Sequence, residues 1–68
     1  MNARNLVTPA DLGRRVSFQF ELPNGFQSEV VGVLESYDAA ADTYFVRTKE
    51  NRLERVPGRG IRFGKVVS

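Results

Sequence analysis

The fold of this chain is decided by one stretch, Ser28-Glu29-Val30-Val31-Gly32-Val33-Leu34-Glu35-Ser36-Tyr37-Asp38. It is the longest uninterrupted run in the sequence that is rich in β-branched residues, which favour strands. Apolar residues occupy both parities, with Val31 and Val33 on one side and Val30 and Leu34 on the other. Such a strand serves both sides of a strongly curved sheet. Gly32 has no Cβ, so the strand can bend there or another backbone can approach it closely. The pattern predicts the central strand of a small β-barrel.

Shorter strand patterns accompany the central one, and turn residues separate them. The segment Arg15–Leu22 alternates apolar and polar residues, as a half-buried strand does. Before it, Thr8–Gly13 places a capping threonine ahead of a proline and ends in glycine, which predicts one helical turn. Leu12 in this turn is expected to close one end of the barrel. The remaining strands are predicted at Thr43–Lys49, Arg52–Val56 and Ile61–Val67.

Five strands joined by short turns indicate an all-β fold, a small five-stranded SH3-like barrel with one short N-terminal helical turn. A five-stranded OB-fold is the alternative, but it normally needs more than the 68 residues of this chain. We expect a flexible N-terminus at residues 1–7 and a single SH3-like barrel domain at residues 8–68. The predicted core comprises Val16, Phe18, Phe20, Val31, Val33, Val46, Leu53, Ile61 and Phe63, with Leu34, Tyr44 and Val56 as additions.

The composition excludes several kinds of site. The chain has no cysteine and no histidine, so it cannot form a Ser/His or Cys/His nucleophilic pair or a zinc site of the usual ligands. Its acids are scattered through turns and outward strand positions. We therefore expect no catalytic, cofactor-binding or metal-binding residues. No apolar run reaches the roughly 18 residues that a membrane span needs, so we expect a soluble, cytoplasmic chain without a membrane partner.

The charges are unevenly distributed. Residues 1–46 carry three arginines against six acids, a net charge of −3, whereas residues 47–68 carry seven basic residues against two acids, a net charge of +5. A basic half of this size attracts phosphate groups or an acidic partner. The alternative is that these residues are the solvated positions of alternating strands. The candidate binding surface consists of Phe45, Arg47, Lys49, Arg52, Arg55, Arg59 and Arg62.

Five segments of the chain also carry a family resemblance: Asp11–Val16, Val31–Asp38, Phe45–Thr48, Glu54–Pro57 and Gly64–Val67. In this order they resemble the small SH3-like domain at the N-terminus of actinobacterial GNAT-family N-acetyltransferases. The resemblance implies an accessory domain that packs on its own downstream catalytic domain or on another protein, and it leads us to expect a fragment of a longer chain. Acetyl-CoA is implied only for that catalytic domain. The long turn from Asp38 to Thr43 and the sequence Gly58-Arg59-Gly60 depart from the family pattern.

One short match to the same family is misleading. Arg55-Val56-Pro57-Gly58-Arg59-Gly60 fits Arg-x-x-Gly-x-Gly, the pattern by which GNAT enzymes hold the pyrophosphate of acetyl-CoA. That site needs consecutive backbone N–H groups at the start of a helix. Here Pro57 lacks an N–H group and the residues after Gly60 have the pattern of a strand. We therefore interpret the segment as a turn of the barrel.

Two functions follow as hypotheses. The first is a non-catalytic accessory or interaction domain of an N-acetyltransferase. The alternative is a small nucleic-acid-binding β-barrel that uses the basic C-terminal half, with Phe45 or Tyr37 stacking a base between phosphate-binding cations. Against this alternative, an aromatic residue in the position of Phe45 is more often a core residue of the second face or an interface residue than a base-stacking one. Binding of proline-rich peptides is disfavoured, because that groove needs clustered aromatic residues and the chain has no tryptophan and two tyrosines.

Overall fold

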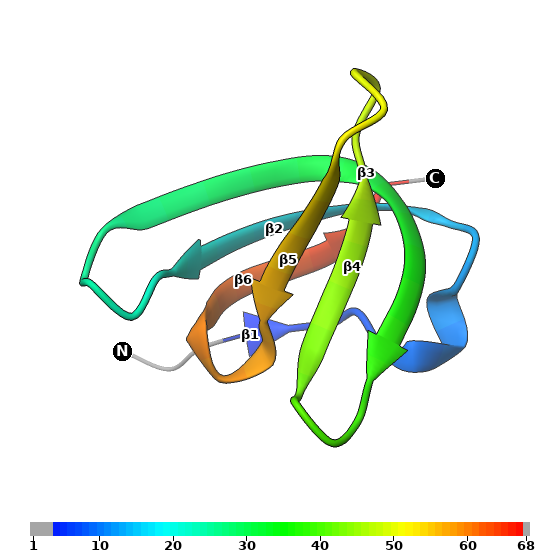
Figure 1. The fold of residues 1–68 in the computed structure, drawn as a ribbon. Coiled ribbons are helices and arrows are strands. Elements are labelled where there is room, and N and C mark those ends of the chain that lie inside the picture. The colour runs from blue at the N-terminus through cyan, green and yellow to red at the C-terminus, as the bar shows by residue number, and fades with distance from the viewer. Residues whose placement is uncertain (1–3, 68) are drawn as a thin grey trace.

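Six strands form one curved sheet in the computed structural model, which describes residues 4–67 (Figure 1). The elements are β1 (Arg4–Asn5), η1 (Pro9–Asp11), β2 (Arg15–Glu21), β3 (Gln27–Asp38), β4 (Thr43–Arg47), β5 (Leu53–Pro57), η2 (Gly58–Gly60) and β6 (Ile61–Val66), where η denotes a short 3-10 helix. The all-β prediction and the N-terminal helical turn are confirmed. In the part of the chain that the structure describes, no helix is long and apolar enough to cross a membrane.

The strand order in the sheet is β1-β6-β2-β3-β4-β5. Neighbouring strands run antiparallel except β1 and β6, which run parallel. Five of the strands correspond to the five predicted ones, and β1 is additional. The ladder of the described residues does not join β1 to β5, so the closure of this sheet into a barrel stays a prediction.

The helical turn η1 is held by the cap that its sequence predicted. The Thr8 side chain accepts a hydrogen bond from the Ala10 amide at 3.2 Å, and the Asp11 carboxylate accepts one from the Thr8 amide at 2.9 Å. This reciprocal pair is a capping box. Leu12 after the turn is 52% exposed, so the prediction that it closes one end of the barrel is wrong.

The segment before η1 lies on the sheet. Arg4 and Asn5 pair with Phe63 and Gly64 of β6, and the Leu6 amide donates to the Gly64 carbonyl at 2.9 Å. Val7 follows and is only 3% exposed. Residues 1–7 were expected to be a flexible N-terminus; residues 4–7 contact the fold as described, and residues 1–3 lie outside the described residues.

The long strand β3 connects the two halves of the sheet. Its residues Gln27–Val33 pair with β2, and its residues from Val33 onward pair with β4, with a register shift between Leu34 and Ser36. Figure 1 shows β3 curving strongly between these two halves. Gly32 lies just before the change of partner, where the strand approaches the Arg47 backbone closely. This close approach is what the sequence predicted for Gly32.

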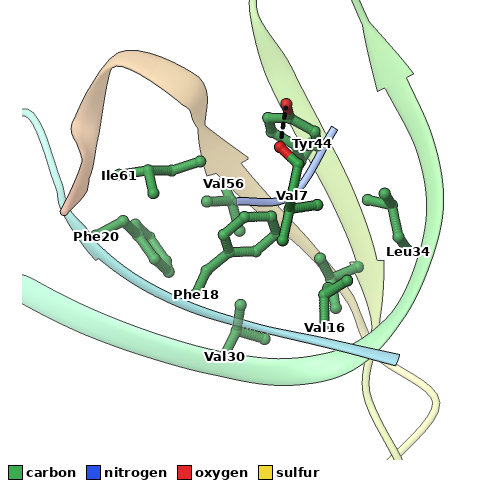
Figure 2. Close-up of a cluster of buried hydrophobic side chains, with 10 residues drawn as sticks. Val7, Val16, Phe18, Phe20, Val30, Leu34, Tyr44, Val56 and Ile61 are labelled. Atoms are coloured by element: carbon green, nitrogen blue, oxygen red, sulfur yellow. Dashed lines mark hydrogen bonds between the residues drawn. The ribbon is translucent and has the colours of Figure 1, made fainter. Parts of the chain in front are cut away.

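The core lies within the curve of the sheet (Figure 2). The buried side chains come from five strands and from the segment before η1, and they are Val7, Val16, Phe18, Phe20, Val30, Leu34, Tyr44, Val46, Val56 and Ile61. Phe18 is fully buried, and its ring centroid lies 5.3 Å from that of Tyr44. Val16, Phe18, Phe20, Val46 and Ile61, and the added Leu34, Tyr44 and Val56, are confirmed as core residues.

Four residues predicted for the core are exposed instead: Val31, Val33, Leu53 and Phe63, at 37–46%. The reason is parity, because successive side chains of a strand point to opposite faces. In β3 the inward residues are Val30, Gly32 and Leu34, which turns Val31 and Val33 outward. In β5, burial of Val56 likewise turns Leu53 to the outer face. In β6, the pairing with β2 shifts register between Ile61 and Phe63, so Gly64 points inward and Phe63 outward although Ile61 is buried.

Candidate functional site

Two of the predicted binding residues face each other across strands. Phe45 of β4 pairs with Arg55 of β5. Both point to the outer face of the sheet, because Tyr44 and Val46 on either side of Phe45 are buried in the core. Phe45 is half-buried and Arg55 is exposed. The structure therefore brings together one aromatic side chain and one cation of the predicted surface.

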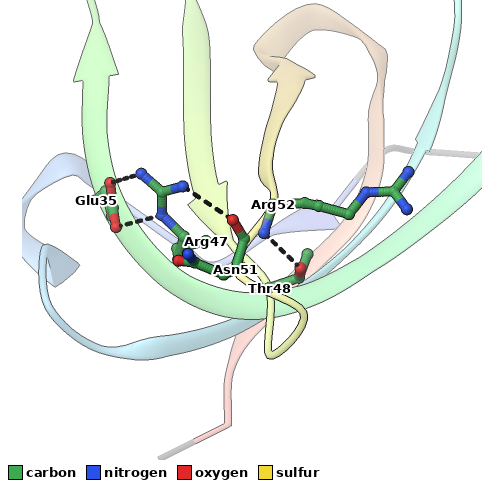
Figure 3. A network of polar contacts seen from close by, with 5 residues as sticks. All are labelled: Glu35, Arg47, Thr48, Asn51 and Arg52. Atoms are coloured by element: carbon green, nitrogen blue, oxygen red, sulfur yellow. Dashed lines mark hydrogen bonds and ion pairs between the residues drawn. The ribbon is translucent and has the colours of Figure 1, made fainter.

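Arg47 shares this face but is already engaged. Its Nε donates to Glu35 Oε2 at 2.8 Å, its Nη2 donates to Glu35 Oε1 at 3.2 Å, and its Nη1 donates to the Asn51 carbonyl at 3.2 Å (Figure 3). Hydrogen bonding to Arg47 lowers the pKa of Glu35, and hydrogen bonding to Glu35 raises the pKa of Arg47. A ligand phosphate would have to displace a bidentate carboxylate to reach this guanidinium.

The turn between β4 and β5 carries Lys49 and Arg52. Both are exposed. The Arg52 Nε lies 3.9 Å from Glu54 Oε2, a loose pair between two exposed side chains. Lys49 takes part in no ion pair among residues 4–67. This turn therefore offers two accessible cations next to the Arg47 and Glu35 pair.

Arg59 and Arg62 lie at the opposite end of β5, the former in η2 and the latter in β6. Arg62 forms an ion pair with Glu21 of β2. Arg59, Arg62 and Glu21 line one hollow of about 450 Å³. The length of β5, about 15 Å at roughly 3.3 Å per residue, separates this group from the β4–β5 turn. The seven predicted residues thus occupy two separate areas. Two of their cations, Arg47 and Arg62, form close ion pairs with carboxylates, and Arg52 forms the loose pair with Glu54.

The segment that matches the pyrophosphate pattern is a turn between two strands. Residues 58–60 form η2, and β6 begins directly after it at Ile61. The Gly58 amide donates to the Asp42 carbonyl at 2.7 Å, and the Asp42 carboxylate lies against Gly58. The Asp42 carboxylate would repel a pyrophosphate at this position. The Gly58 amide, which would have to contact that anion, already donates its hydrogen bond to the Asp42 carbonyl.

A larger hollow, of about 610 Å³, lies between the first half of β3 and the β4–β5 turn. Of the predicted residues it includes only Arg47 and Lys49. The others were missed, and they are Arg15, Phe20, Ser28, Glu29, Val30, Val31, Gly32, Val33, Thr48, Glu50 and Glu54. Nothing in the spacing of these residues indicates a hollow, because it arises where two distant segments cross.

The backbone of β3 is unpaired beside this hollow. At one end of the pairing of β3 with β2, the Phe26 carbonyl accepts a hydrogen bond from the Leu22 amide at 2.7 Å. At the other end, the Leu34 amide donates to the Arg14 carbonyl at 2.9 Å. Both groups therefore point toward the β2 side. Backbone groups alternate in direction along a strand, and the pairing of Gln27–Val33 with β2 has no register shift. Even-numbered residues therefore bond to β2, while the N–H and C=O groups of Gln27, Glu29 and Val31 point away from it.

No other strand among the described residues takes up these groups, because the pairing with β4 starts only at Val33. We call this segment, Gln27–Gly32, the β3 edge. One signal in the sequence could have revealed it. The central run is much longer than the predicted strand at Thr43–Lys49, so part of it had to remain without a partner on that side.

The hollow next to the β3 edge carries charges of both signs. Its cations are Arg15, Arg47 and Lys49, and its acids are Glu29, Glu50 and Glu54. On the outer face of the sheet beside the hollow, Val33 of β3 pairs with Arg15 of β2 on one side and with Arg47 of β4 on the other. Arg47 pairs in turn with Leu53 of β5. Val31, Val33 and Leu53 therefore add exposed apolar area to a rim of mixed charge.

Comparison of this chain with protein-family models, with curated proteins and with solved structures gave no significant match.

Proposed function

We propose that this chain is a non-catalytic interaction domain that binds an extended protein segment along the β3 edge. The observation that carries the proposal is the row of unpaired N–H and C=O groups at Gln27, Glu29 and Val31, which opens onto a hollow of about 610 Å³. Main-chain groups in this arrangement accept an added strand, a common mode of peptide recognition.

The β3 edge also lacks most of the devices that keep a sheet edge from pairing. Such devices include proline, bulges, lysine side chains and cover by another element. Between Gln27 and Gly32 there is no proline and no register shift in the pairing with β2, and Glu29 is the one charged residue. An added strand would exchange water for backbone hydrogen bonds worth about 1 kcal/mol each and would cover Val31. The edge is thus suited to binding.

The finer part of the proposal places this domain at the N-terminus of a GNAT-type N-acetyltransferase. It is supported by the five sequence segments quoted above. Three of them correspond to the second half of β3, to β4 and to β5, so the resemblance covers the hairpin that lines the hollow. The simplest test is to read the coding sequence beyond Ser68: continuation into an acetyl-CoA-binding domain supports this assignment, and a stop codon overturns it.

A second function, nucleic-acid binding, is favoured by one specific observation. Phe45 faces Arg55 across β4 and β5, and the exposed cations Lys49 and Arg52 lie at the end of the same hairpin. A base stacked on Phe45 would place neighbouring phosphates near these cations. The ion pairs of Arg47 and Arg62 count against it, because they remove two of the six cations from the predicted surface.

The interaction function is tested by selecting binders from a library of random decapeptides displayed on phage. We expect selected peptides to protect the amides of Glu29 and Val31 from hydrogen exchange. Val31→Pro removes an N–H group that faces away from β2, and proline is tolerated at such edge positions. The Val31→Pro variant should keep its fold but no longer bind the selected peptides. The control variant Gln19→Ala, on the outer face of β2, should bind these peptides as tightly as wild type does. Peptides that bind both variants equally would overturn the proposal.

The nucleic-acid function is tested by an NMR titration with single-stranded RNA and DNA at low and raised salt. Phosphate contacts weaken steeply with salt. Salt-sensitive shifts at Phe45, Lys49 and Arg55 that disappear in Arg55→Glu would support nucleic-acid binding. Absence of shifts at low salt would exclude it.

A further inference from the structure

We propose that the β3 edge is occupied by the β3 edge of a second copy of this chain, so that two sheets join into one across a twofold axis. This inference rests on the proposed function, because it uses the same row of backbone groups. A twofold interface brings the same surface of both copies together, so the β3 edge must be complementary to itself in shape, hydrogen bonding and charge.

The direction of the backbone groups limits the registers that two antiparallel edges can adopt. Only odd-numbered residues present free groups, so an odd residue must face an odd residue. A twofold axis at Glu29 would place two glutamates directly opposite each other, which is unfavourable. An axis at Val31 leaves one free pair, because its next pair needs Val33, whose backbone groups are already bonded to Arg47. Axes at Ser28 and at Val30 each leave two free pairs. The axis at Val30 pairs Glu29 with the Val31 of the second copy, and the ladder ends there because the following pair would again need Val33.

The register centred on Val30 also matches charges. In this register Glu29 of the second copy lies opposite Val31. Because Val33 pairs with Arg47, a longer β4 would place residue 49 opposite Val31, so the incoming glutamate takes the place of residue 49 in the sheet. The hollow around Val31 contains Lys49, Arg47 and Arg15. Arg47 is held by Glu35, whereas Lys49 is free to approach the incoming carboxylate. The twofold axis repeats this contact, so one interface contains two equivalent pairs of Glu29 with Lys49.

Apolar contacts agree with the same register. Val30 faces inward at 8% exposure, and its counterpart lies directly opposite it at the axis. Both Val30 and Phe20 line the hollow, so the valine of the second copy extends the core across the interface. On the outer face, Val31 at 46% exposure would be covered by the stem of Glu29 from the second copy.

The test is the oligomeric state by sedimentation equilibrium over a range of protein concentrations. We expect a concentration-dependent dimer at low salt. Glu29→Lys and Lys49→Glu should each weaken the dimer by at least about tenfold, because each places like charges at both contacts. Both residues are exposed, so both variants should fold normally by circular dichroism.

A mixture of the two single variants distinguishes this interface from any other. In the mixed dimer, the lysine introduced at position 29 of one chain meets the glutamate introduced at position 49 of the other, and the native Glu29 meets the native Lys49. An equimolar mixture of Glu29→Lys and Lys49→Glu should therefore dimerise again. A wild-type monomer at all concentrations, or a dimer indifferent to both substitutions, overturns the inference. A wild-type monomer that binds displayed peptides in a Val31-dependent way overturns the second copy alone, and the interaction function then stands.

Discussion

The backbone carbonyl of Arg47 lies directly against the α-carbon of Gly32, so that a side chain at residue 32 would overlap it. A Cβ there would also lie 2.8 Å from the Arg47 carbonyl carbon and 2.9 Å from Val46 Cγ1. This contact is made where β3 exchanges β2 for β4 as its partner. It sets how closely the β4–β5 hairpin crosses β3, and it thereby shapes the hollow beside the β3 edge.

Gly32→Ala should consequently destabilise the domain. The added methyl group meets backbone atoms, which cannot rotate away, so the two strands must separate. Overpacking of this kind costs about 1–3 kcal/mol, and urea unfolding measures it. Ser28→Ala, at an exposed position of the same strand, serves as the control and should be nearly neutral. Equal stability of Gly32→Ala and wild type would show that the hairpin moves freely.

Phe18→Ala should unfold the domain or bring it close to unfolding. Phe18 is fully buried, and its ring packs against Tyr44 and over Gly64. Phe→Ala substitutions in a core cost about 3–5 kcal/mol, comparable with the total stability of so short a chain, at roughly 0.05–0.15 kcal/mol per residue. Phe26→Ala is the matched control, since Phe26 is 71% exposed. We expect Phe18→Ala to lose the far-ultraviolet circular dichroism signal of the folded domain and Phe26→Ala to keep it. An equal loss in both variants would contradict the placement of Phe18 in the core.

The sequence predicted where the strands lie better than which side of each strand is buried. In β2 the alternation was clean, and Val16, Phe18 and Phe20 are core residues as predicted. In β3 both parities are apolar, and a shift of one residue turns every side chain over. The choice between the two parities depends on pairing with β2 and β4, which involves residues far away in the chain. Val31 and Val33 were therefore assigned to the wrong face.

The candidate site was predictable only where it depends on alternation within one strand. Phe45 and Arg47 share a face because they are two residues apart in one strand. The ion pair of Arg47 with Glu35 was not predictable, because a register shift between Leu34 and Ser36 interrupts the ladder there. The β3 edge likewise depends on the unequal lengths of β3 and β4 and on their crossing at Gly32, and no local pattern encodes that crossing.

The pair of Glu35 and Arg47 should make the stability of the domain depend on pH in acid. Hydrogen bonding to Arg47 lowers the pKa of Glu35 from its ordinary value of 4.5. A lowered pKa in the folded state means that the stabilising contribution is present above pH 4.5 and is lost as the pH falls through the folded pKa. Glu35→Gln should abolish this part of the acid dependence.

The measurement is the urea midpoint of wild type and Glu35→Gln between neutral pH and the acid limb, at low and high salt. Glu54→Gln is a matched control, because the pair of Glu54 with Arg52 is long and exposed. The plots of urea midpoint against pH for wild type and Glu35→Gln should converge in acid. There Glu35 is protonated in both the folded and the unfolded state, and it is then neutral like glutamine. Parallel curves throughout would show that the ion pair does not form in solution.

Tyr37 and Asp42 should produce the corresponding effect in base. The Tyr37 hydroxyl donates to Asp42 Oδ1 at 2.8 Å, while the Asp42 carbonyl accepts from the Gly58 amide at 2.7 Å. The hydrogen bond to this carboxylate is the main cause that raises the pKa of Tyr37 above its ordinary value of 10.0. A raised pKa means that the stabilising contribution is fully present below pH 10.0 and is lost as the pH rises through the folded pKa.

Asp42→Asn removes the negative charge and should bring the pKa of Tyr37 down toward its ordinary value. The titration of tyrosinate absorbance in the ultraviolet measures this change. Tyr44 also titrates above its ordinary pKa, mainly because of burial, so the measurement is made in a Tyr44→Phe background to isolate Tyr37. In that background the titration of Asp42→Asn should begin at lower pH than that of the parent. Coincident titrations would mean that the Tyr37 hydroxyl does not donate to Asp42, and the turn between β3 and β4 would then be held by the bond from Gly58 to the Asp42 carbonyl alone.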